Sequence, residues 1–241
     1  MLRTILPRLH RFAAARVAPD GVFGLHLTAG VLVLLAAAFV FARIAEGVVT
    51  GAAITVLDAQ LAQWFHAHAT PALTRVMLFV THWHSVAGIL AMVVLLAAWL
   101  WQRRERYWVL ALVAAVPGGQ LLNVLMKTAF QRPRPQFDDP FLTLPTYSFP
   151  SGHTVAATLL YGFLACYVFR HVRDWRWRCA ALVLACLLVA LVALSRMYLG
   201  VHYLSDVLAA VCEGCAWLAI CLAATTSLQR RNAARSAGRG A

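Results

Sequence analysis

Charged residues are scarce in this sequence. Only 12% of the 241 residues are Asp, Glu, Lys or Arg, and 62% are hydrophobic, whereas a soluble globular domain is about a quarter charged. A chain with so few charges cannot cover its surface with polar groups, which excludes an ordinary cytosolic enzyme and a disordered protein. No polar block is long enough for a second domain, so the sequence predicts one compact domain in a membrane.

Acidic residues are rarer still. Nine Asp and Glu stand against 21 Lys and Arg, which gives a formal net charge of +12. Such a basic chain is typical of nucleic-acid-binding proteins. Here the charges form short clusters between apolar runs, and this pattern indicates signals of membrane topology. We therefore expect the lipid bilayer, and no nucleic acid, as the partner of this chain.

Six apolar stretches, each with at most one charged residue, are long enough to cross a bilayer as helices. They cover residues 22–42, 76–101, 107–126, 151–169, 179–195 and 207–228. The runs are continuously apolar and do not alternate, which argues against a β-barrel. The sequence therefore predicts an all-α, polytopic membrane protein with six transmembrane helices in one domain, 22–228. The remaining segments, 1–21 and 229–241, are basic tails, and we expect the second to be disordered.

Four arginines precede the first apolar stretch, and this arrangement resembles a secretory signal peptide. They are Arg3, Arg8, Arg11 and Arg16. The apolar run is longer than the roughly 7–15 residues of a signal core. We therefore interpret 22–42 as a membrane-spanning helix, with a cleaved signal as the alternative.

Lys and Arg are divided unequally between the two sides of the predicted bundle. The two tails and the loops after the second and fourth spans hold 15 of them, and the other loops hold six. The positive-inside rule then predicts that both termini are cytoplasmic. The loops after the first, third and fifth spans would face the periplasm, or the outside, of a bacterial inner membrane. Four of the six outward cations lie in two of these loops, which indicates anion binding: Lys127, Arg132, Arg134 and Arg196.

Residues 47–81 allow two interpretations. Apolar side chains recur there at helical spacing, at Ile54, Leu57, Leu61 and Trp64. This spacing favours an amphipathic helix in the outer membrane interface. The alternative is a plain extracellular loop. Pro71 would end such a helix.

Neither the histidines nor the cysteines form a recognisable ligand set. Four histidines fall near one surface, at His66, His68, His82 and His84. No carboxylate or cysteine cluster accompanies them, and HxH spacing does not put both rings on one helix face. The six cysteines lie in or at the ends of spans four to six, which argues against a disulfide framework. We expect no metal.

Three polar clusters stand at the outer ends of spans three to six. The first contains Lys127 and Arg134, fixed cations near a stiff Arg-Pro-Arg-Pro run. Arginine can donate two parallel hydrogen bonds to phosphate oxygens. Taken alone, these residues are equally explained as cations that contact lipid headgroups.

The second cluster, Pro-Ser-Gly-His, opens the fourth span. Ser151 is a suitable N-cap, so the helix would begin there. Free N–H groups and the positive end of the helix dipole favour an anion at this point. Gly152 lets the backbone approach a ligand closely, and His153 could give a proton. The alternative is an ordinary helix start with an interfacial histidine.

The third cluster contains Arg196, His202 and Asp206. His202 and Asp206 are four residues apart and would share one helix face. A carboxylate in that position fixes the tautomer of an imidazole and raises its basicity. A structural His–Asp pair is the alternative. Taken together, the three clusters supply a charge clamp, a nucleophile and an acid, as phosphoryl transfer requires.

The three clusters match the signature of the type 2 phosphatidic acid phosphatase superfamily, and the chain resembles that family. The pattern K-x6-RP, PSGH and SR-x5-H-x3-D is matched at every position between Lys127 and Asp206. The superfamily also includes bacterial nonspecific acid phosphatases and vanadium haloperoxidases, which are soluble. The spacing from Lys127 selects Arg134 as the signature arginine, which leaves Arg132 only a minor part in contacting substrate.

The resemblance implies a metal-independent mechanism with no cofactor. His202 would attack phosphorus and form a phosphohistidine, Asp206 would orient it, and His153 would protonate the leaving oxygen and later activate water. The phosphoryl oxygens would be held by Lys127, Arg134, Ser151, Gly152 and Arg196.

The spans indicate a lipid leaving group but do not select one. The candidate substrates are undecaprenyl pyrophosphate, phosphatidylglycerol phosphate, phosphatidic acid and lipid A phosphate. One alternative is a lipid-phosphate phosphotransferase. Another is a non-catalytic lipid-phosphate transporter or binding protein, but such a protein would need the cations and not the His–Asp pair with a second histidine.

Overall fold

The structure is a computed structural model and describes residues 25–238. This part of the chain is helical and contains no strand, so the predicted all-α class is confirmed. Its helices are α2 (Leu25–Val49), α3 (Ala53–Ala67), α4 (Pro71–Trp83), α5 (Val86–Gln102), α6 (Arg106–Phe130), α7 (Gly152–His171), α8 (Trp175–Tyr198) and α9 (Leu204–Gly238). The basic tail 1–21, on which the signal-peptide alternative depends, lies outside the described residues.

Five of these helices are long and apolar enough to cross a membrane, namely α2, α6, α7, α8 and α9. The predicted second span, 76–101, is not one straight helix: α4 and α5 meet at an angle of 50°. The break has a local cause. Ser85 accepts a hydrogen bond from Gly88 N at 3.3 Å and so caps a new helix. If the bent pair counts as one span, the number of spans is the predicted six.

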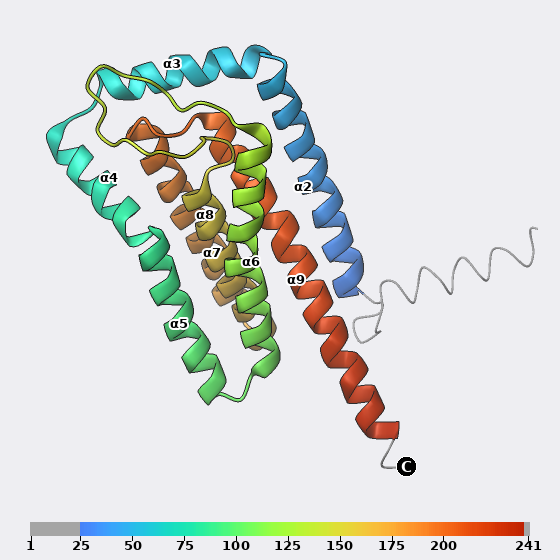
Figure 1. Cartoon of the computed structure of the whole chain (residues 1–241). Coiled ribbons are helices and arrows are strands. Elements are labelled where there is room, and N and C mark those ends of the chain that lie inside the picture. The colour runs from blue at the N-terminus through green and yellow to red at the C-terminus, as the bar shows by residue number, and fades with distance from the viewer. Residues whose placement is uncertain (1–24, 239–241) are drawn as a thin grey trace, which may run out of the picture.

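The ambiguous segment 47–81 contains a helix. Helix α3 lies across one end of the bundle, between the ends of α2 and α4 (Figure 1). It carries one carboxylate, Asp58, which is buried. Pro71 does not end α3, which stops at Ala67; it opens α4, where its missing N–H leaves no helical bond unmade.

The predicted disorder of the C-terminal tail is wrong up to Gly238, because α9 continues through these residues. The sequence of this part is rich in Ala and Arg, which favour helix. Asn232 also donates a hydrogen bond to the hydroxyl of Tyr107 on α6 at 3.0 Å. The last turns of α9 are therefore tied to the bundle.

The bundle core is formed where α6, α7 and α9 pack together. Its buried side chains include Leu112, Leu159 and Phe163. Small residues allow these helices to approach closely, as is common in membranes. A Cβ atom added at Gly214 on α9 would lie 2.8 Å from Cβ of Thr158 on α7. This close packing fixes the relative positions of the helix ends that carry the polar clusters.

Both ends of the described chain lie at the end of the bundle opposite α3 (Figure 1). The loop between α6 and α7 lies beside α3, whereas the arginine-rich turn between α5 and α6 lies at the other end. The positive-inside rule predicts that α3 and the α6–α7 loop lie outside the cytoplasm.

Labelling of single cysteines tests this orientation. Asp138 and Arg173 are both exposed, on the α6–α7 loop and between α7 and α8. In a background with the six native cysteines replaced, a membrane-impermeant maleimide should label Asp138→Cys on intact cells, and Arg173→Cys only after permeabilisation. The reverse pattern would mean that the bundle is inverted.

Candidate active site

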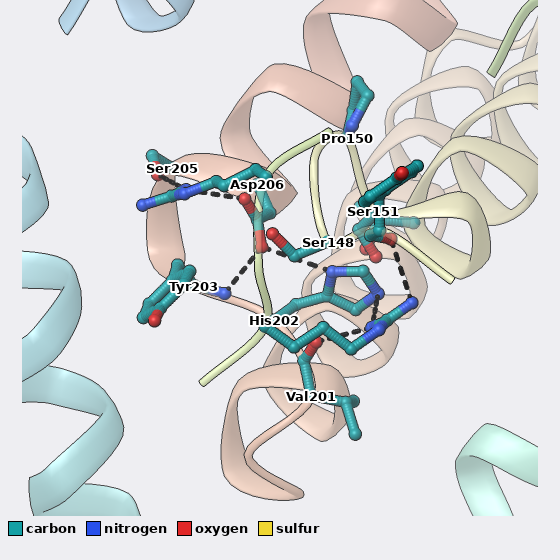
Figure 2. Close-up of polar contacts among 12 residues, drawn as sticks. Ser148, Pro150, Ser151, Val201, His202, Tyr203, Ser205 and Asp206 are labelled. Atoms are coloured by element: carbon teal, nitrogen blue, oxygen red, sulfur yellow. Dashed lines mark hydrogen bonds and ion pairs between the residues drawn. The ribbon is translucent and has the colours of Figure 1, made fainter. Parts of the chain in front are cut away.

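The three polar clusters meet at the end of the bundle that α3 covers. The cations of the first come from the end of α6 and the loop 131–151. The Pro-Ser-Gly-His run opens α7, and the third cluster joins α8 to α9. Figure 2 shows His202, Tyr203, Ser205 and Asp206 around one point, with Ser148 and Ser151 close by. Helix packing thus brings together residues that lie up to 79 positions apart in the sequence.

A tight turn places His202 beside the end of α8. The backbone N–H groups of Val201 and His202 both donate to the carbonyl of Arg196, at 3.2 and 3.3 Å. Gly200 has a φ of +69°, a conformation that L side chains rarely adopt. A Cβ atom there would also lie 2.8 Å from the ring of Phe137. The turn therefore needs glycine at this position.

His202 and Asp206 interact, as predicted, but they do not share a helix face, because His202 lies in the turn before α9. Nδ1 of His202 lies 3.3 Å from Oδ2 of Asp206, and both side chains are buried. Asp206 is in the first turn of α9, where a carboxylate is favoured by the helix dipole. Its Oδ2 also accepts a hydrogen bond from Tyr203 N at 2.9 Å, which closes the helix start.

The other nitrogen of the imidazole faces a cation. Nε2 of His202 lies 3.2 Å from Nη1 of Arg134. A guanidinium has only donors, so Nε2 accepts and the ring proton lies on Nδ1, from which it is donated to Asp206. This tautomer leaves the lone pair of Nε2 directed away from the carboxylate, as a nucleophile requires.

Arg134 uses all five of its N–H donors within the protein. Besides His202 Nε2, it donates to the carbonyl of Val201 and to the carbonyl and hydroxyl of Thr146, and its fifth donor goes to the carbonyl of Tyr147. Lys127 donates to the same loop, with Nζ 2.7 Å from the carbonyl of Tyr147. The two cations thus hold residues 146–148 of the loop between α6 and α7 close to His202.

Arg196 differs from the other two cations, because most of its donors are unused. It is 1% exposed, and its Nη1 donates to the hydroxyl of Thr81 on α4. Its Nε and Nη2 atoms are buried and have no hydrogen-bond partner among the residues that the structure describes. A buried charge with free donors is costly unless an acceptor is supplied. An oxyanion is the acceptor that a guanidinium binds best.

The start of α7 is where the sequence predicts it, but Ser151 does not cap the helix with its side chain. Instead Ser151 Oγ accepts from Thr154 Oγ1 at 3.1 Å, and its N–H donates to the carbonyl of Asp206. The first-turn N–H groups are therefore not satisfied by the side chain at the cap position. Gly152 lies tightly against α6, since an added Cβ atom would be 3.0 Å from Oδ1 of Asn123. His153 follows, within electrostatic range of Arg196 and His202.

Arg132 lies behind the pair and not on the side of Nε2. Its Nη1 donates to Asp206 Oδ1 at 2.6 Å and its Nη2 to Asp58 Oδ2 at 2.8 Å. Asp58 and the third partner, Ser205, are absent from the sequence-based site. The one signal for Asp58 is a lone carboxylate next to the apolar positions of α3. Glu213, the single charge in the sixth span, is also buried and accepts from Asn123 Nδ2 at 3.1 Å.

The membrane-length helices, and a buried His–Asp pair beside three cations at one end of their bundle, indicate a membrane phosphatase. The chain belongs to the PAP2 superfamily, whose family model matches residues 107–230. The matched segment contains every position of the sequence signature. The resemblance inferred from the three motifs is therefore confirmed.

Named relatives and solved structures agree with this class. The chain is 31% identical over 139 residues to phosphatidylglycerophosphatase B of Bacillus subtilis, covering 57% of this chain and 68% of the relative. It is 36% identical over 126 residues to decaprenylphosphoryl-5-phosphoribose phosphatase of Mycobacterium tuberculosis, covering 50% and 62%. The crystal structure of a transmembrane PAP2-type phosphatidylglycerolphosphate phosphatase from B. subtilis matches 78% of this chain and 93% of its own, with a TM-score of 0.71 and 26% identity. Aquifex aeolicus LpxE shares the fold, with a TM-score of 0.55 and 24% identity over 69% of this chain and 94% of its own.

The surroundings of His202 determine its charge in the free protein. Burial lowers the pKa of His202 well below its ordinary value, and three neighbouring cations lower that pKa further. The ring should therefore stay neutral at about pH 5.5, where an ordinary histidine is largely protonated. Nitrogen NMR of ¹⁵N-histidine-labelled protein should show the Nδ1–H tautomer at that pH, in a signal that His202→Gln removes. An imidazolium signal would contradict the described geometry.

Proposed function

We propose that this membrane phosphatase hydrolyses a phosphomonoester or pyrophosphate of a lipid at the outer face of the membrane, through a phosphohistidine on His202. The observation that carries this proposal is that Nε and Nη2 of Arg196 have no hydrogen-bond partner within residues 25–238, beside a histidine whose Nε2 faces Arg134. A phosphoryl group between them would satisfy the free donors and present phosphorus to the nitrogen.

The contacts of Arg134 fit the same step. The N–H that now points at Nε2 of His202 loses its acceptor when Nε2 bonds to phosphorus. A phosphoryl oxygen, already attached to that phosphorus, can then accept it. Arg134 would in this way interact with the nucleophile in the free protein and with the phosphoryl group in the transition state, where such stabilisation accelerates the reaction.

Residues of the site can supply the nucleophile and the proton that the covalent step requires. Nε2 of His202 forms the P–N bond while the bond from phosphorus to the leaving oxygen breaks, and His153 gives that oxygen a proton. Asp206 compensates the positive charge that develops on the imidazole. Water then attacks phosphorus and gives a proton to His153, which releases phosphate and the free His202. Lys127, the Ser151 hydroxyl and the Gly152 N–H would hold the remaining phosphoryl oxygens.

A lipid leaving group is supported by position and by the relatives. The site lies at the ends of membrane-spanning helices, next to α3, where a headgroup would lie. Phosphatidylglycerophosphatase B and lipid phosphate phosphatase delta of Arabidopsis thaliana, which is 37% identical over 70 residues, are named for lipid phosphates. The assay described next compares several lipids and shows which one is preferred.

Phosphate release from a panel of substrates tests the proposed reaction. Purified protein should release phosphate from phosphatidylglycerol phosphate, phosphatidic acid or undecaprenyl pyrophosphate with a higher kcat/KM than from a soluble alkyl phosphate. The activity should persist in EDTA, because the cations of the site supply the charge that Mg²⁺ supplies elsewhere, and vanadate should block it. Loss of activity in EDTA with recovery on adding Mg²⁺, or no release from any lipid, would contradict the proposal.

The two histidines should fail in different ways when replaced. His202→Ala removes the nucleophile and should abolish both turnover and phosphoenzyme. His153→Ala removes only the acid, which typically costs about 10²–10⁴-fold. That loss should be smaller for p-nitrophenyl phosphate, whose leaving group needs no proton. Rapid-quench labelling should find phosphohistidine in His153→Ala and in the control His82→Ala, an exposed histidine. Phosphate on His153 would reverse the two roles.

A further inference from the structure

A buried ion-pair chain leads from the surface helix α3 to His202. Asp58 on α3 bonds to Arg132, Arg132 bonds to Asp206, and Asp206 bonds to His202, with N···O distances of 2.8, 2.6 and 3.3 Å. The carboxylates of Asp58 and Asp206 are 0% exposed, and the Arg132 side chain is 11% exposed. Bulk water screens these charges little, so their ionisation depends on the neighbouring charges, which for Asp206 also include Lys127 and Arg134.

Arg132 is held rigidly between its two partners. Its guanidinium lies 4.2 Å from the centre of the Tyr203 ring, in a cation–π contact. Its Nη1 also donates to Ser205 Oγ at 2.7 Å. Burial would lower the pKa of Arg132, but the two carboxylates outweigh burial and raise it. The group is therefore a fixed positive charge that both carboxylates share.

Asp58 is fixed as firmly from the other side. Its Oδ1 accepts from Ser205 N at 2.9 Å, and its Oδ2 accepts from the hydroxyl of Ser205 as well as from Arg132. Asp58 thus satisfies a first-turn N–H of α9. Through Arg132 and Ser205, the surface helix is joined to the helix that carries Asp206.

We propose that Arg132 and Asp58 are positioning residues, which keep Asp206 ionised and oriented toward Nδ1 of His202. This role rests on the proposed function, in which His202 is the nucleophile. Arg132 neutralises one of two buried carboxylates that lie on either side of it. Asp58 holds Nη2 of Arg132, and this leaves Nη1 directed at Oδ1 of Asp206. Neither residue touches the phosphoryl group.

The charge balance predicts whether a second substitution raises or lowers the activity of an Arg132 variant. Removal of Arg132 alone leaves two buried carboxylates without their shared cation, and like charges raise the pKa of one of them. A protonated Asp206 could no longer compensate a charged imidazole. Removal of the Asp58 charge as well eliminates this repulsion. The double variant should therefore be more active than the single one, although it lacks one more native interaction.

The experiment compares Arg132→Met, Asp58→Asn and the double variant. Arg132→Met should lower kcat roughly 10²-fold with little change in KM, less than the about 10⁴-fold that loss of the orienting carboxylate costs in the serine protease triad. Its rate should recover as pH rises, because Asp206 then loses its proton. The double variant should regain about tenfold in kcat and lose this pH dependence. A purely structural role predicts the opposite order, with the double variant the worst.

Controls separate folding and global charge from the proposed role. Arg43→Met removes an exposed arginine that pairs with Glu46 on α2 and should leave kcat unchanged. Thermal unfolding in detergent should be recorded for each variant. If Arg132→Met does not fold, Arg132→Lys serves in its place, because lysine keeps the charge but lacks the fork that bridges two carboxylates. Its kcat should also rise when Asp58→Asn is added, and a further fall would overturn the proposal.

A spectroscopic readout distinguishes failure of this proposal from failure of the proposed function. The ¹⁵N signals of His202 should show the Nδ1–H tautomer in the wild type, a mixture of tautomers in Arg132→Met, and the wild-type pattern in the double variant. If His202 is phosphorylated but Arg132→Met leaves both kcat and tautomer unchanged, only the positioning role is refuted. If His202 is never phosphorylated, the proposed function fails, and the tautomer series still decides the positioning role.

Discussion

The site depends on Asp206, because this one residue bonds to the turn that carries His202, to the loop that carries Arg132 and to the start of α7. Its Oδ2 accepts from the His202 ring and from Tyr203 N, and its Oδ1 accepts from Arg132. Its backbone carbonyl accepts from Ser151 N at 3.1 Å, which ties the start of α7 to the start of α9. A fully buried carboxylate is tolerated only when its oxygens are occupied in this way. The hydrogen bonds that offset the cost of burying the Asp206 carboxylate therefore also set the position of the His202 ring.

The opposite side of the histidine is governed by repulsion among buried cations. Lys127, Arg134 and Arg196 lie close enough together to lower the pKa of His202 jointly. Two of these cations are compensated by backbone carbonyls of residues 146–148. Among the described residues, the side chain of Arg196 donates a hydrogen bond only to the hydroxyl of Thr81. An anion that entered here would relieve repulsion and satisfy donors at once, so phosphate binding and the stability of this end of the bundle are linked.

The sequence was sufficient for those features that depend on local patterns. Apolar runs predict most of the helices. The contact of His202 with Asp206 is also predicted, but its premise of one shared helix face is wrong, because His202 lies in the turn before α9. Features that depend on contacts between distant segments could not be read in this way. The break between α4 and α5 lies within an apolar run, where only Ser85 signals a new helix start. The Asp58–Arg132 pair spans 74 positions, and no periodicity relates its members.

The family model, like the local sequence patterns, does not include the contact between Asp58 and Arg132. The matched segment begins at residue 107, so it contains Arg132 and Asp206 but not α3. Arg132 shares its charge between a carboxylate inside that segment and one outside it. One guanidinium between two carboxylates leaves one net negative charge in this group of three side chains, next to the imidazole, which suits the positive ring of a phosphohistidine. The catalytic histidine therefore experiences a charge that depends on where α3 sits, and a displacement of this surface helix would change the ionisation of Asp206 without moving any residue of the family signature.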